Sequence, residues 1–86
     1  MRYLVERRLG MRAAFEVDSI VERNADAGVT WLWSYVSDDG RTCFCLYEAP
    51  SPEAIRGASA RNGLPVERIV EVSLLDPHPY ARRRPA

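Results

Sequence analysis

The sequence predicts one α+β domain whose elements follow the order β-α-β-β-α-β. Two observations carry this prediction. Four runs rich in β-branched and aromatic residues are interleaved with two helical stretches, and an Asp-Gly turn joins the two middle runs. The chain has 86 residues, of which 47% are apolar and 28% charged, so it is long enough for one domain and too hydrophobic for disorder.

The first half of the domain is predicted to be a strand followed by a helix. In residues 2–9, Tyr3, Val5 and Leu9 alternate with Glu6 and Arg8, which places the two sets on opposite faces. A helix is expected over residues 12–27, because apolar residues recur there at spacings of three and four. These apolar residues are Ala14, Val17, Val21 and Ala25.

The second half begins with a hairpin and ends with a helix and a strand. Residues 29–36 and 42–48 are predicted strands on either side of the turn at residues 37–40. Ser51 is expected to cap the next helix, with Pro52 at its first position, and Gly63 marks its end. The apolar surface of that helix is assigned to Ala54, Ile55, Ala58 and Ala60. The last strand is predicted at residues 69–75, with Val70, Val72 and Leu74 on one face.

This order of elements is that of the ferredoxin-like split βαβ fold, in which two helices cover one face of a four-stranded antiparallel sheet. We expect the domain to span residues 1–77 and residues 78–86 to form a Pro- and Arg-rich tail. The other sheet face is too apolar to remain in water. A second copy would cover it, so we expect a homodimer whose two sheets enclose an α+β barrel.

Charge and composition exclude several classes of function. The twelve basic residues are all arginines and balance twelve acids, but without Arg82, Arg83 and Arg84 the body carries a net charge of minus three. The third strand also has cysteines where RNA-binding domains of this topology place stacking aromatics, so we expect no nucleic-acid partner. The only histidine, His78, lies between two prolines, which favours a role other than catalysis.

Hydropathy and the two cysteines indicate the cellular compartment. No apolar run is long enough for a signal peptide or a membrane helix, so we expect no membrane partner. Cys43 and Cys45 are adjacent same-face positions of one predicted strand, where a mutual disulfide would be strained. We therefore expect two buried free thiols in a reducing cytoplasm.

An aromatic strip on the second strand is one candidate site. Trp31, Trp33 and Tyr35 recur with a period of two and are expected to project from one face. They are interpreted either as packing residues or as the wall of a cavity for a small apolar ligand, with Glu6 and Arg8 among its polar groups. The second interpretation makes the chain a ligand-binding barrel or a cyclase- or monooxygenase-like enzyme without metal.

A metal site is the other candidate. Cys43, Cys45, Glu48 and His78 supply thiolate, carboxylate and imidazole donors, which suit nickel, zinc or copper. The spacing C-x-C with a distant histidine is not that of a dedicated zinc site. The sequence alone therefore leaves open both the metal and the ligand set, as well as a plain interaction module with no site of its own.

The stretch Phe44-Cys45-Leu46-Tyr47-Glu48-Ala49-Pro50, with the residues that flank it between Gly28 and Val72, resembles a small bacterial family of nickel-responsive or nickel-binding domains. The resemblance implies a ferredoxin-like fold, a homodimer with a barrel-like interior and nickel bound near the subunit interface. It also implies that Cys45 and Glu48 are the metal-binding residues. On this basis we predict a homodimeric, nickel-type protein that acts in metal sequestration or sensing.

Overall fold

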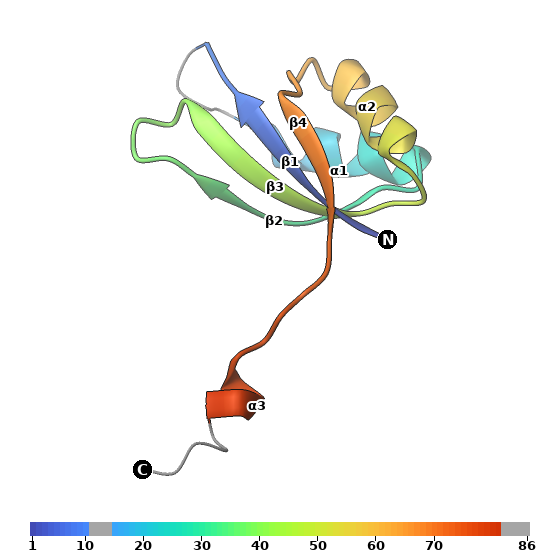
Figure 1. The fold of residues 1–86 in the computed structure, drawn as a ribbon. Helices are drawn as coiled ribbons and strands as arrows, with labels where there is room; N and C mark the ends of the chain where they lie inside the picture. The colour runs from blue at the N-terminus through green and yellow to red at the C-terminus, as the bar shows by residue number, and fades with distance from the viewer. Residues whose placement is uncertain (11–14, 82–86) are drawn as a thin grey trace.

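The computed structural model describes residues 1–10 and 15–81 and has the predicted order of elements. Strand β1 (Arg2–Arg8) leads to helix α1 (Val17–Asp26), the hairpin of β2 (Thr30–Val36) and β3 (Thr42–Glu48) follows, and helix α2 (Pro52–Arg61) leads to β4 (Arg68–Val72). A short helix, α3 (His78–Ala81), comes last. The four strands form one antiparallel sheet in the order β2-β3-β1-β4, and α1 and α2 lie on one face of it (Figure 1). The predicted ferredoxin-like α+β fold is confirmed.

The core lies between the sheet and the two helices. It is made by alternate side chains of β1 and β3 together with the inner face of α2. The central register is antiparallel, with Val5 opposite Cys45 on β3 and opposite Ile69 on β4. Alternation then places Leu4 and Glu6 on the face that no helix covers. We call these two surfaces the helix face and the open face of the sheet.

Helix α2 begins as predicted. The Ser51 side chain accepts a hydrogen bond from the backbone N–H of Ala54 at 3.2 Å, and Pro52 occupies the first turn. The inner side of the helix differs in one position, because Ser59 is buried whereas Ala60 is exposed. Ser59 occupies an inner position because its hydroxyl is needed there as a hydrogen-bond acceptor, as described below.

The apolar stripe predicted for α1 is wrong. Its buried residues are Ile20 and Asn24, whereas Val17 and Val21 are about half exposed. Asn24 is buried because it accepts a hydrogen bond from the side-chain amide of Asn62, which joins α1 to the end of α2. Residues 11–14, which include the expected start of the helix and Ala14, lie outside the described residues.

The last strand is shorter than predicted. β4 ends at Val72, which pairs with Arg2. Arg2 is the first residue of the antiparallel strand β1, so β1 offers no further residue for β4 to pair with. Leu74 therefore lies beyond the sheet and does not share a strand face with Val70 and Val72. Within residues 1–10 and 15–81, no helix is long and apolar enough to cross a membrane. The homodimer stays a prediction.

Candidate functional site

The open face of the sheet carries apolar side chains from all four strands. Phe44 is 39% exposed, Trp33 is 51% exposed and Val70 is 36% exposed, although each lies on a regular strand. Leu4, Leu46 and Val72 lie between them and are partly buried. This arrangement makes one continuous apolar surface that the rest of the described chain leaves uncovered.

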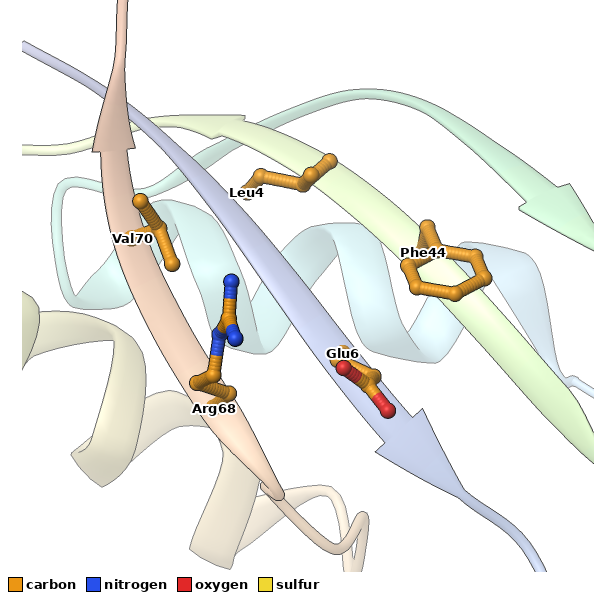
Figure 2. Close-up of a pocket in the computed structure, with 5 residues that line it drawn as sticks. All are labelled: Leu4, Glu6, Phe44, Arg68 and Val70. Carbon is orange, nitrogen blue, oxygen red and sulfur yellow. The ribbon is translucent and has the colours of Figure 1, made fainter.

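Two hollows mark this surface, and the smaller one lies at its centre. It has a volume of about 50 Å³ and is lined by residues of β1, β3 and β4, namely Leu4, Glu6, Phe44, Arg68 and Val70. Figure 2 shows Phe44 and Val70 on opposite sides of β1, with the charged groups of Glu6 and Arg68 at one end. The hollow therefore has apolar walls and one polar end, a combination typical of small-molecule sites.

Three charged groups of the open face lie close together at Glu6. Its carboxylate Oε2 lies 3.7 Å from Nε of Arg8 on the same strand. Arg68 is the direct cross-strand neighbour of Glu6 on β4. The face thus offers both signs of charge next to an apolar wall, and it can hold a ligand that has an apolar body and one polar or charged group.

The second hollow lies at the end of the sheet where β1 begins. Its volume is about 190 Å³, and Leu4 also lines the central hollow, so the two adjoin. The lining residues come from all four strands and from the segment after β4: Arg2, Leu4, Trp33, Leu46, Val72, Ser73 and Leu74. We call this hollow the end groove.

A β-bulge divides the predicted aromatic strip between the two faces. Trp31 pairs with Tyr47, but Trp33 pairs with Leu46, so Leu32 is an extra residue without a partner on β3. The prediction that Trp31 shares a face with Trp33 and Tyr35 is therefore wrong. The bulge leaves Trp33 and Tyr35 on the open face, with Glu6 and Arg8, and so brings together four of the five predicted pocket residues.

Trp31 instead belongs to the helix face. Its indole ring packs against the core, and its edge meets the ring of Phe15 at a centroid distance of 6.2 Å. The indole N–H donates a hydrogen bond to Oγ of Ser34 at 2.8 Å. These contacts make Trp31 a packing residue.

The helix face holds the two cysteines and a buried arginine. Cys43 and Cys45 are free thiols, 0% and 2% exposed, with their Sγ atoms 3.7 Å apart. Burial raises the pKa of Cys43 to about 12, and the neighbouring Cys45 adds to the shift. The Cys43 thiol is therefore protonated near neutral pH, and a protonated thiol is a poor metal ligand.

Arg7 is the buried charged residue of this face, and it is 2% exposed. It donates hydrogen bonds through Nη2 to the Tyr47 hydroxyl at 3.0 Å and to Ser59 Oγ at 2.9 Å, and through Nη1 to the Pro65 carbonyl at 2.9 Å. Within residues 1–10 and 15–81 no carboxylate pairs with it. Arg7 thus joins β1 to β3, to α2 and to the loop before β4.

The structure does not bring the predicted metal-binding residues together. Cys45 points into the core, whereas Glu48 is exposed and accepts a hydrogen bond from the Met1 amine at 2.7 Å, which lowers the pKa of its carboxyl. His78 lies in α3, where its Nδ1 is 2.7 Å from Oδ1 of Asp76. Across the described residues, no three His, Cys, Asp or Glu side chains form a group able to hold a metal ion.

Comparison with protein families shows which family the chain belongs to. The family described as "Nickel responsive protein SCO4226-like" matches residues 3–72. The chain belongs to this family. The match spans both long helices and every strand except the first residue of β1, and it confirms the family resemblance predicted from the sequence.

Among solved structures, the chain is similar to one titled "Crystal structure analysis of SCO4226 from Streptomyces coelicolor A3(2)". The TM-score is 0.69 and the sequence identity is 23%, over 88% of this chain and 100% of the other. At this identity the likeness shows the fold alone. A search of curated proteins found no match.

Two residues that the structure places in these contacts were not predicted as site residues from the sequence. Arg7 has the same parity as Tyr3 and Val5, so the strand alternation already placed it on the helix face. Arg68 precedes the predicted last strand, and only the pairing of β4 with β1 places it beside Glu6.

Proposed function

We propose that the chain is a homodimeric binding protein in which the open faces of two sheets pack together and enclose a site for a small amphipathic ligand. The observation that carries the proposal is the uncovered apolar surface formed by all four strands, with Trp33 and Phe44 exposed on it. Each Å² of apolar surface removed from water contributes about 25 cal/mol, so covering this face stabilises a dimer.

The size of the hollows supports a site that needs two copies. The central hollow and the end groove have volumes of about 50 and 190 Å³. Sites for organic ligands usually have volumes of about 300–1,000 Å³, so neither hollow is sufficient alone. A second sheet placed over the first would close these hollows into a larger cavity with apolar walls and charged ends.

The chemistry of the wall defines the class of ligand. Leu4, Phe44 and Val70 offer apolar contact, while the carboxylate of Glu6 and the guanidinium of Arg68 can each bind one polar group. A molecule with a flat or aliphatic body and a single carboxylate or amine fits this wall. An anionic group would be held by Arg68, whose planar fork matches a carboxylate.

The dimer is tested by light scattering and sedimentation at micromolar concentration. We expect wild type to have twice the mass of one chain and Phe44→Glu to weaken association about 30-fold or more, because a carboxylate would be buried in the interface. Val21→Glu is the matched control, since Val21 is 48% exposed on α1 and should not alter association. A monomeric wild type contradicts the proposal.

The site is tested with an amphipathic dye, anilinonaphthalene sulfonate, as the probe. We expect saturable binding to the wild-type dimer and a loss of affinity in Arg68→Gln, which keeps the shape of the wall but removes its cation. Binding that is absent, or that Arg68→Gln leaves unchanged, contradicts an amphipathic site at this position.

Nickel responsiveness is a second candidate, and the description of the family supports it. The residues of one copy do not fit a nickel site, because Cys45 is buried on the helix face and Glu48 is exposed and paired with Met1 and Arg2. A nickel site would therefore need donors from two copies. Elemental analysis of the purified protein and nickel titration calorimetry of wild type and Cys45→Ser test this candidate, which fails if wild type binds no stoichiometric metal.

A further inference from the structure

We propose that the segment after β4, residues 73–81, docks on the open face of a second copy, with Leu74 and Leu75 near the partner's end groove. We call this segment the arm. The inference rests on the proposed homodimer and adds to it a reciprocal exchange of arms between the two copies.

The arm has no place in the sheet of its own copy. The pairing of β4 with β1 stops at Val72 and Arg2, and residues 73–77 pair with no strand in the described part of the chain. Figure 1 shows this segment leaving the body at the end of β4 and carrying α3 away from it. In the described chain the arm therefore contributes little to the packing of its own domain.

The arm is nevertheless apolar where it leaves the sheet. Leu74 and Leu75 are each 77% exposed, the highest exposures among the large hydrophobic residues of the described chain. Single exposed leucines are common on protein surfaces, but here two neighbouring ones lie on an unpaired segment beside an apolar groove. Successive side chains of an extended segment point to opposite sides, so the pair offers apolar surface in two directions.

The end groove is the nearest surface that such leucines fit. It is lined mainly by apolar groups, and the base of the arm at Leu74 forms one of its sides. In a dimer with two-fold symmetry, each arm meets the partner's surface just as the partner's arm meets its own. Both grooves are thus filled with one arm per copy.

The size of the sheet supports this occupant. Four strands about 4.8 Å apart and about 20 Å long form a face of roughly 400 Å², whereas a stable interface buries about 800 Å² per partner. The arms supply additional interface area. Five extended residues reach about 17 Å, close to the width of four strands, so an arm can cross the partner's sheet.

The first experiment compares two full-length double variants by sedimentation. Leu74→Asp with Leu75→Asp removes the apolar surface of the arm, while Val17→Asp with Val21→Asp makes the same change at half-exposed positions of α1. We expect the dimer dissociation constant of the arm variant to be about tenfold higher than that of wild type or more, and that of the α1 variant to stay within about twofold of wild type.

The second experiment locates the arm. A chain with Leu75→Cys is mixed with a differently tagged chain with Trp33→Cys and oxidised, so that an engineered disulfide can form only between two chains. We expect a covalent heterodimer, since Trp33 lines the end groove. The native thiols are buried and serve as an internal control for access.

The outcomes separate the arm from the dimer. If wild type is a dimer and the arm variant associates as tightly as wild type, the exchange of arms is overturned and the homodimer stands. The same holds if the Leu75→Cys and Trp33→Cys chains form no disulfide with each other. A monomeric wild type overturns both. A weakened arm variant with a heterodimeric cross-link supports the exchange.

Discussion

The two faces of the sheet are built from alternate residues of the same strands, yet they differ in what their polar groups do. On the helix face, Arg7 is fully buried and bonded to three separate elements. On the open face, its neighbours Glu6 and Arg8 pair with each other at 3.7 Å, near the surface. Polar chemistry on the helix face thus serves folding, whereas on the open face it lies at the surface, where we propose that it binds a ligand.

The largest effect is expected from breaking the helix face at its centre. Arg7→Ala removes three hydrogen bonds and leaves a cavity, so we expect the free energy of unfolding to fall by about 3–5 kcal/mol. Arg8→Ala is the matched control on the open face and should cost less than about 0.5 kcal/mol. Urea denaturation at one protein concentration, low enough that association no longer contributes, measures both. A loss below 1 kcal/mol for Arg7→Ala would contradict the role of this network.

A milder change tests one bond of that network. Tyr47→Phe removes the hydroxyl that accepts from Arg7 but keeps the ring, so we expect a loss of about 1–2 kcal/mol in the same denaturation experiment. Tyr35→Phe, at a position 69% exposed on the open face, should leave stability unchanged. Equal effects of the two substitutions would remove the difference between the faces.

Alkaline pH should weaken the helix face selectively. Burial raises the pKa of Tyr47 and of Cys43 to about 12, above their unfolded values of about 10 and 8.5. Between these values the folded state holds protons that the unfolded state has lost, so stability is fully present below pH 8 and falls as the pH rises toward 12. Denaturation at pH 8, 9, 10 and 11 measures this fall, and Cys43→Ala should reduce it. A flat profile for wild type would contradict the prediction.

The smallest effect is expected from the charges of the open face. Glu6→Gln breaks the pair with Arg8, in which the arginine side chain is 70% exposed, so we expect unfolding to change by less than about 0.5 kcal/mol. The substitution is best measured at a protein concentration low enough that association no longer contributes. A loss above 1 kcal/mol would assign Glu6 to folding instead of binding.

Most of the fold could be predicted from the sequence because its local patterns agree with its tertiary structure. The Asp39-Gly40 turn, the Ser51 cap and the alternation of Tyr3 and Val5 each specify an element without reference to distant residues. The parity of strand positions also places Cys45 and Glu48 on opposite faces, since they are three residues apart. The sequence therefore contained evidence against a shared metal site in one copy.

The remaining features depend on contacts between distant segments. The bulge at Leu32 has no glycine or proline to mark it. The alternation of side chains along residues 29–36 therefore predicts one regular strand there, without a bulge. The inner side of α1 could not be found from apolar spacing because Asn24 is buried by its bond to Asn62, 38 residues away. The end of β4 at Val72 is likewise set by where β1 begins.

The bulge gives the molecule two independent fluorescent reporters. Trp31 is held against the core beside Phe15, so its emission follows folding, whereas Trp33 is 51% exposed on the open face and would follow association or ligand binding. Two tryptophans of one strand can therefore report folding and association separately, a distinction that usually requires two fluorescent labels. With either tryptophan replaced by phenylalanine, the other reports alone, without any dye attached to the protein.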